Sequence, residues 1–126
     1  MPRTFNEAPN APSAIGPYSQ AVEANGFVFL SGQIPLDPGS GTIVPGGIEA
    51  QTKQVLENIK AVLAHAGLTF SNVVKTTIFM TDLAHFQIVN GLYENAFRDA
   101  KPARSTVQVA ALPKGAMIEI EVVANR

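Results

Sequence analysis

One amphipathic helix places the strongest constraint on how this chain can fold. Between Ile48 and Ala66, apolar or small side chains recur at spacings of three and four residues, while Glu49 and Lys53 lie off this stripe. Gly67 then follows, and glycine is the usual residue just past the end of a helix. A helix with one apolar stripe must cover another apolar surface, and the chain has only 126 residues with which to build it. We therefore expect a single domain, residues 1–126.

Five segments have the pattern of β-strands, and a second helical segment lies between two of them. The predicted strands are Tyr18 to Ala24, Phe27 to Gln33, Val73 to Met80, Arg104 to Val109 and Met117 to Ala124. Asn25-Gly26 indicates a tight hairpin between the first two strands. Asp82 has the side chain of an N-cap for a helix from Leu83 to Arg98. The order β-β-α-β-α-β-β predicts an α+β fold with a mixed sheet.

The two predicted helices should cover the same face of this sheet. This follows if each helix is a right-handed crossover between parallel neighbouring strands. The other face would then be bare, although the strand from Phe27 begins with four apolar residues, a pattern that suggests burial on both sides. A bare apolar face is best covered by another copy of the chain, so we expect a homo-oligomer.

Composition excludes several kinds of site and partner. The chain has no cysteine, which excludes disulfides, thiolate catalysis and thiolate metal sites, and the isolated His65 and His85 argue against any other metal site. The formal net charge is −1 and the basic residues form no run, which argues against nucleic acid as a partner. No apolar stretch has the length of a membrane span or the pattern of a secretory signal, so we expect a cytoplasmic protein.

Arg104 and Glu119 are the main candidates for chemistry, and they lie on the last two predicted strands. Arg104 shares one face of its strand with Thr106. Its side chain could form an ordinary salt bridge with Glu119, Glu121 or Asp99, or it could bind the carboxylate or phosphate of a ligand through two parallel hydrogen bonds. Glu119 could lie on a solvated strand face or act as a general base that activates water. Taken alone, these residues favour the structural roles.

Three other places carry weaker signals. Ser31-Gly32 ends an apolar strand abruptly, where a glycine permits either a bulge or the close approach of a ligand. Tyr18 could be a core aromatic residue or could supply a hydroxyl group to a site. Asn90-Gly91 places two poor helix formers in the middle of the second predicted helix, and such a conflict is typical of functional or closely packed positions.

Seven short motifs occur in a fixed order between about Ala14 and Ala124. They are IGPYSQA from residue 15, SGQIP from 31, NIKAVL from 58, VKTT from 74, PARS from 102, LPKG from 112 and IEIE from 118. Together they resemble the RidA (YjgF) family of enamine/imine deaminases. The resemblance implies a chorismate-mutase-like sheet with two helices on one face. It also implies a homotrimer whose sheets surround a central barrel, with sites in the clefts between subunits.

The activity implied by this resemblance is the hydrolysis of reactive 2-imino acids and their enamine tautomers. The expected substrates are 2-aminoacrylate, 2-iminobutanoate and 2-iminopropanoate, which pyridoxal-phosphate dehydratases release, and the products are 2-oxo acids and ammonia. No cofactor is expected. Some relatives are described as endoribonucleases or translation inhibitors, and a ligand-binding or chaperone-like module that uses the same clefts is a further alternative.

The resemblance also assigns roles to individual residues. Arg104 resembles the arginine that binds the substrate carboxylate, and Glu119 resembles the acid that positions the attacking water. The positions that resemble the rest of the substrate site are Tyr18, Ser31, Gly32, Asn90, Thr106 and Pro113. Thr106 is a departure, because many members have cysteine there; threonine keeps a small polar group and removes the thiol.

Overall fold

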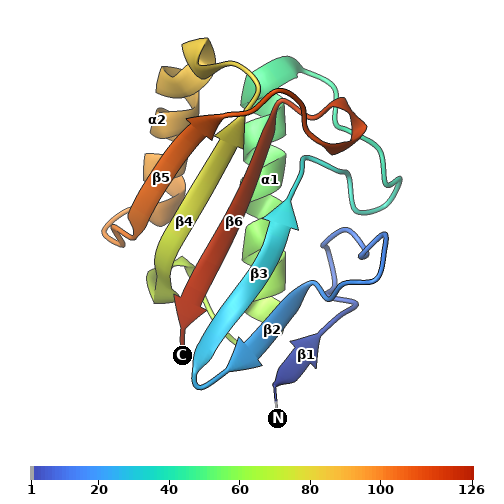
Figure 1. Cartoon of the computed structure of the whole chain (residues 1–126), viewed down its shortest axis with the longest axis vertical. Coiled ribbons are helices and arrows are strands. Elements are labelled where there is room, and N and C mark those ends of the chain that lie inside the picture. The colour runs from blue at the N-terminus through green and yellow to red at the C-terminus, as the bar shows by residue number, and fades with distance from the viewer. Residues whose placement is uncertain (1) are drawn as a thin grey trace.

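A computed structural model describes residues 2–126 as one six-stranded sheet with two helices packed on one face (Figure 1). The strands are β1 (Arg3–Phe5), β2 (Ala21–Ala24), β3 (Phe27–Gln33), β4 (Val73–Met80), β5 (Ala103–Gln108) and β6 (Ile118–Asn125). The helices are α1 (Gly47–His65) and α2 (Phe86–Phe97), with short 3-10 turns η1 (Phe70–Asn72), η2 (Leu83–His85) and η3 (Pro113–Gly115). The predicted α+β class, with both helices on one face of a mixed sheet, is confirmed.

The sheet has the strand order β1-β2-β3-β6-β4-β5, and within it only β4 and β5 pair in parallel. Helix α2 connects these two strands and is a crossover between parallel neighbours, as predicted. Helix α1 connects β3 to β4, and here the prediction of neighbouring strands is wrong. The last strand, β6, lies between β3 and β4 and pairs antiparallel with both.

Elements differ from the predictions by more than one residue in three places. Strand β1 was not predicted, because three residues are too few to show a strand's alternation. Strand β2 begins at Ala21 rather than at Tyr18. The helix predicted from Leu83 starts as the 3-10 turn η2 and becomes α-helical at Phe86. Its predicted cap is present, since Asp82 Oδ1 accepts a hydrogen bond of 2.9 Å from the Ala84 backbone N–H.

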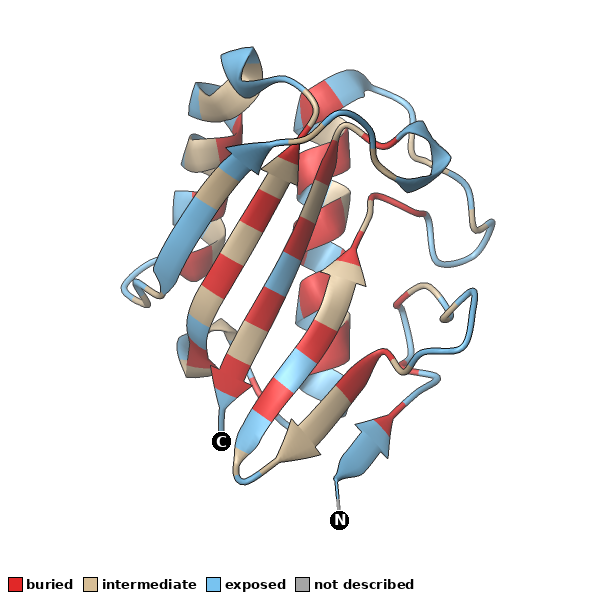
Figure 2. Cartoon of the chain, in the orientation of Figure 1, coloured by how far each residue is buried: buried red, intermediate tan, exposed pale blue. Residues whose placement is uncertain are grey.

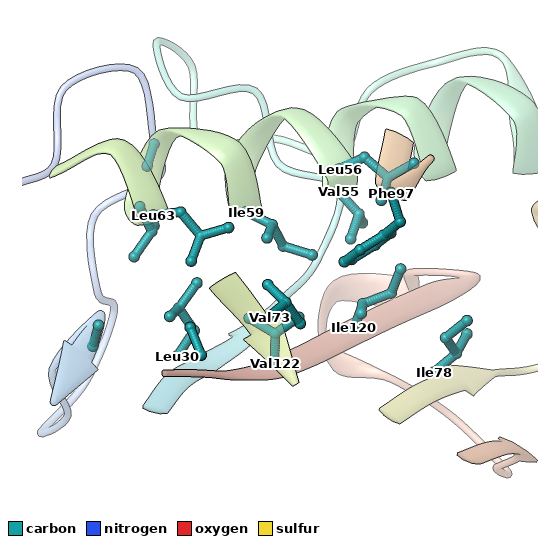
Figure 3. Packing of buried hydrophobic residues seen from close by; sticks show 14 of the residues in the cluster. Leu30, Val55, Leu56, Ile59, Leu63, Val73, Ile78, Phe97, Ile120 and Val122 are labelled. Atoms are coloured by element: carbon teal, nitrogen blue, oxygen red, sulfur yellow. The ribbon is translucent and has the colours of Figure 1, made fainter. Parts of the chain in front are cut away.

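The hydrophobic core fills the space between the two helices and the sheet. Figure 3 shows Val55 and Ile59 of α1 directed toward Ile120 and Val122 of β6. Buried and more exposed residues alternate along β3 and β6, as Figure 2 shows, because successive side chains of a strand point to opposite faces.

The opposite face of the sheet is uncovered in a single chain. In β3, Val28 and Leu30 are buried beneath the helices, whereas Phe27 and Phe29 are 39% and 47% exposed. Burial of this strand on both sides is therefore not achieved within one copy of the chain. The uncovered face carries large apolar side chains, which is the condition that led us to expect association between copies.

Candidate active site

Arg104 and Glu119 lie on opposite faces of the sheet. Arg104 is the register partner of Thr76, which is fully buried beneath the helices, so the arginine side chain lies on the helix-covered face. Glu119 lies between Ile118 and Ile120, which are both fully buried, so its carboxylate lies on the uncovered face. The salt bridge considered between these two residues is consequently absent within one chain. Within residues 2–126, no ion pair involves Arg104.

Three side chains of α2 surround the guanidinium group of Arg104 at the edge of the sheet. Its Nη1 donates a hydrogen bond of 2.8 Å to Oδ1 of Asn90 on α2. Its central carbon lies 4.9 Å from the ring centre of Tyr93 and 5.4 Å from that of Phe86. No other hydrogen bond to this guanidinium group occurs within the described residues, so the remaining N–H groups are free to bind a ligand.

A cavity of about 720 Å³ opens beside this arginine, between α2 and the start of β5. Asn90, Tyr93 and Arg104 are among its lining residues, and the buried Phe97 also contributes. Asn90 and Tyr93 are three positions apart on α2, and this spacing places their side chains on the same face of a helix. The result is a fixed cation next to open space, which suits the binding of a carboxylate.

A second cavity, of about 440 Å³, brings together five of the residues that the sequence resemblance assigns to the site. They are Tyr18, Ser31, Gly32, Pro113 and Glu119, joined by Ile15 and Ile34. The β3–β6 pairing is irregular between Leu30 and Gln33, so the bulge considered for this segment is present and forms part of the cavity wall. The hydroxyl group of Ser31 donates a hydrogen bond of 2.6 Å to the Ser19 carbonyl oxygen.

Gly32 and Glu119 are in direct contact within this second cavity. A Cβ atom at position 32 would lie 2.8 Å from Cδ of Glu119 and would collide with its Oε2. Glycine is therefore required for the carboxylate to lie over this backbone. Burial raises the pKa of the Glu119 carboxyl group, and the neighbouring negative charge of Glu121 raises it further. A half-buried carboxylate with a raised pKa is suited to act as a general base.

Thr106 is placed differently from the other predicted residues. It lies on the same strand face as Arg104, as the register partner of Ile78, but it lines neither cavity. Its Oγ1 atom is buried and has no hydrogen-bond partner within residues 2–126. The hydroxyl group is thus enclosed within one copy of the chain.

Sequence reasoning did not identify every residue around these cavities. Tyr93 and Phe86, both within the second predicted helix, were not singled out. The spacing of three residues between Asn90 and Tyr93 was a signal that both side chains lie on one face of that helix, and both contact Arg104. Ile15 and Ile34 occur in the quoted motifs, but nothing in their pattern distinguished them from core residues.

Metal sites and membrane spans are two further classes of feature that the sequence argued against. In residues 2–126, no group of three or more His, Cys, Asp or Glu side chains gathers as a metal site would require. No helix in this part of the chain combines the length and the apolar character needed to cross a membrane.

Sequence comparison finds relatives along almost the whole chain. A family model described as Endoribonuclease L-PSP matches residues 8–126. Protein DfrA of Myxococcus xanthus is 54% identical over 126 residues, which cover 98% of this chain and 96% of that protein. The human 2-iminobutanoate/2-iminopropanoate deaminase is 52% identical over 114 residues, which cover 90% of this chain and 83% of the human protein. These relatives carry different names, so they establish a family and not one reaction.

Solved structures give the same result. YyfA of Yersinia pestis, described as a protein of unknown function of the conserved Rid protein family, is 52% identical and superposes with a TM-score of 0.96 over 100% of both chains. E. coli TdcF with bound serine is 43% identical, with a TM-score of 0.92 over 98% of this chain and 99% of TdcF. From the matched family model, the close relatives and the shared fold, we conclude that this chain belongs to the RidA family.

Proposed function

We propose that this protein hydrolyses 2-imino acids and their enamine tautomers to 2-oxo acids and ammonia. The observation that carries the proposal is a pair of groups: a half-buried carboxylate that lies over Gly32, and a guanidinium group held by Asn90 with free N–H groups. The names of several mammalian relatives at 50–52% identity, 2-iminobutanoate/2-iminopropanoate deaminase, support the choice of substrate.

The proposed reaction needs an anchor and a base, and no nucleophile from the protein. The free N–H groups of Arg104 bind the substrate carboxylate through two charge-assisted hydrogen bonds. Glu119 accepts a proton from a water molecule as the oxygen of that water forms a bond to the carbon of the protonated imine. Glu119 then returns this proton to the nitrogen of the resulting carbinolamine. The carbon–nitrogen bond breaks as the hydroxyl group gives its own proton back to Glu119, and the products are ammonia and the 2-oxo acid. General-base help of this kind is worth about 10²–10⁴-fold.

We further propose that each site forms between two copies of the chain. The reason is geometric, because the side chains of Arg104 and Glu119 lie on opposite faces of one sheet. A second copy can bring its Glu119 cavity to the Arg104 edge of the first. The uncovered face supplies the apolar contact area, since Phe29 is 47% and Val107 41% exposed. The homotrimer implied by the family resemblance would complete three such sites.

The chemistry of the substrate suggests where it comes from. The family resemblance implies that pyridoxal-phosphate dehydratases acting on serine or threonine release such 2-imino acids, whose hydrolysis already proceeds in water without a catalyst. A protein that accelerates this last step would work beside such enzymes, with small-molecule 2-imino and 2-oxo acids as its ligands and no cofactor of its own. The family description as an endoribonuclease finds no support in this chain's net charge of −1 or its scattered basic residues.

The test couples a threonine dehydratase to this protein and follows the decay of 2-iminobutanoate and the formation of the 2-oxo acid. We expect clear acceleration by the wild-type protein, almost none by Arg104→Ala, and little recovery by Arg104→Lys, because lysine lacks the planar pair of donors. If Arg104→Ala accelerates the reaction as the wild type does, the carboxylate role is wrong. If Glu119→Gln turns over as the wild type does, the general-base role of Glu119 is wrong. If the wild type binds 2-oxobutanoate and does not accelerate the reaction, the protein is better described as a binding module.

A further inference from the structure

We infer that Tyr93 is a positioning residue for Arg104, and thereby a determinant of carboxylate binding in this protein. The inference rests on the proposed function of Arg104 and adds a residue that neither the motifs nor the relatives' names point to. Its basis is a set of contacts that joins the Tyr93 ring to Arg104 by two separate routes, one through space and one through the sheet.

The first route is direct contact between the ring and the cation. The central carbon of the Arg104 guanidinium lies 4.9 Å from the centre of the Tyr93 ring. The face of an aromatic ring carries negative electrostatic potential and attracts a cation placed over it. Such stacking restrains the guanidinium plane and leaves the in-plane N–H groups available to a carboxylate.

The second route runs through the strand next to Arg104. The Tyr93 hydroxyl and Thr76 Oγ1 form a buried hydrogen bond of 2.8 Å. Thr76 is the register partner of Arg104 in the β4–β5 ladder. The ring is therefore tied to the same rung of the sheet that carries the arginine. Burial raises the pKa of the Tyr93 hydroxyl, which keeps this group protonated and able to form the bond.

The aromatic core also restrains the ring. Phe97 stacks on Tyr93 with ring centres 4.3 Å apart and an angle of 25° between the planes, and Phe70 meets Phe97 edge-on at 4.8 Å. Tyr93 is itself buried, so its orientation is set by packing as well as by Thr76. A long, exposed arginine loses rotamer freedom when it binds a ligand, and a ring that already restrains it reduces that loss.

The experiment compares a carboxylate ligand with its uncharged amide. Binding of 2-oxobutanoate and of 2-oxobutanamide is measured for wild type, Tyr93→Leu, Tyr93→Phe, Arg104→Ala and the double variant Tyr93→Leu/Arg104→Ala. We expect Tyr93→Leu to weaken 2-oxobutanoate binding roughly 2- to 30-fold, the range that corresponds to a cation–π contact, and to leave the amide unaffected. Tyr93→Phe keeps the ring and should recover most of the affinity.

The double variant separates positioning from a general packing effect. If Tyr93 acts through Arg104, Tyr93→Leu weakens binding only while Arg104 is present and adds nothing to Arg104→Ala. In turnover, Tyr93→Leu should raise KM for 2-iminobutanoate with a much smaller change in kcat. Phe70→Leu is the matched control, because Phe70 belongs to the same aromatic cluster without contacting Arg104, and it should leave the ratio of carboxylate to amide affinity unchanged.

Three outcomes would overturn an assignment: the first two concern Tyr93, and the third concerns Arg104. An equal loss of affinity from Tyr93→Leu in the wild-type protein and in the Arg104→Ala variant would mean that Tyr93 is structural only. The same conclusion follows if Phe70→Leu lowers the carboxylate-to-amide ratio as much as Tyr93→Leu does. If Arg104→Ala binds 2-oxobutanoate as well as the wild type does, the proposed function fails first, and the role of Tyr93 fails with it.

Discussion

The carboxylate of Glu119 occupies the space in which a side chain at position 32 would begin. A Cβ atom there would collide with Glu119 Oε2, although the backbone at Gly32 has no positive φ angle that would by itself require glycine. The absence of a side chain at this position is thus explained by the carboxylate and not by backbone conformation. This contact makes Gly32 a sensitive test of the Glu119 role.

We predict that Gly32→Ala lowers kcat/KM for 2-iminobutanoate by about 10²-fold, because the new methyl group displaces the base from its position. Gly91→Ala is the matched control. A Cβ atom at Gly91 meets nothing within 4 Å in this chain, and alanine should stabilise α2 by about 0.5–1 kcal/mol. Coupled turnover and thermal unfolding of both variants check the prediction. Full activity in a folded Gly32→Ala protein would contradict it.

The pH dependence of turnover should report the environment of Glu119. Burial and then the charge of Glu121 raise the pKa of this carboxyl group, and a base must be ionised to accept a proton. Activity should therefore fall as pH is lowered through the raised pKa of Glu119. Glu121→Gln removes the second cause, so its acid limb should shift to lower pH than that of the wild type.

The measurement is the pH–rate profile of the two proteins with the same imine. Protonation of the substrate affects both profiles equally, so only the difference between them is interpreted.

The raised pKa of Glu119 also has a consequence for stability. A carboxyl group whose pKa is raised on folding favours the folded state at low pH and loses that contribution as pH rises through the folded pKa. Glu119→Gln should accordingly be at least as stable as the wild type at neutral pH.

The long helix α1 shows what the sequence can predict well. Its continuous stripe and the following Gly67 give both ends to within one residue, Gly47–His65 against Ile48 to Ala66. The strand Val73–Met80 is likewise predicted with the correct ends. The placement of β6 between β3 and β4 could not be predicted, because strand order depends on long-range pairing that leaves no mark on local periodicity.

The candidate site is likewise predicted from the sequence only in part. Alternation along a strand separates two faces, and the motifs single out Arg104 and Glu119, but neither tells which face the helices will cover. The face on which each of the two residues lies follows from the register of β5 against β4 and of β6 against its two neighbours. Only with that register known does it become clear that the two residues are directed away from each other. The alternative of an ion pair between Arg104 and Glu119 within one chain, which the spacing left open, is excluded for this reason.

Thr106 offers a test in which stability and ligand binding are read separately. Its Oγ1 is buried and has no hydrogen-bond partner among residues 2–126, and an apolar group of the same shape avoids that desolvation penalty. We predict that Thr106→Val raises the free energy of unfolding by about 1 kcal/mol, measured by denaturant titration. Thr106→Ser, which keeps the hydroxyl group and removes the methyl group, should be less stable than wild type.

The same Thr106→Val protein tests the substrate-binding role that the family resemblance assigns to this position. Since the hydroxyl group lines neither cavity, we expect 2-oxobutanoate to bind Thr106→Val as tightly as the wild type. A clear loss of affinity would show that the Thr106 side chain turns toward the ligand in the assembled protein.

The last prediction concerns the separation of Arg104 and Glu119 onto opposite faces of the sheet. If each site takes its arginine from one subunit and its glutamate from the next, two inactive variants can restore each other. Arg104→Ala and Glu119→Gln, unfolded together in equal amounts and refolded, should regain about a quarter of wild-type turnover, because half of the positions supply Arg104 and half of their neighbours supply Glu119. Mixing Arg104→Ala with the double variant Arg104→Ala/Glu119→Gln is the control. It should restore no turnover, since neither protein has Arg104. Mixed assemblies that remain as inactive as the separate variants would contradict a site shared between subunits, and in that case the opposed faces seen in one chain would have no catalytic meaning.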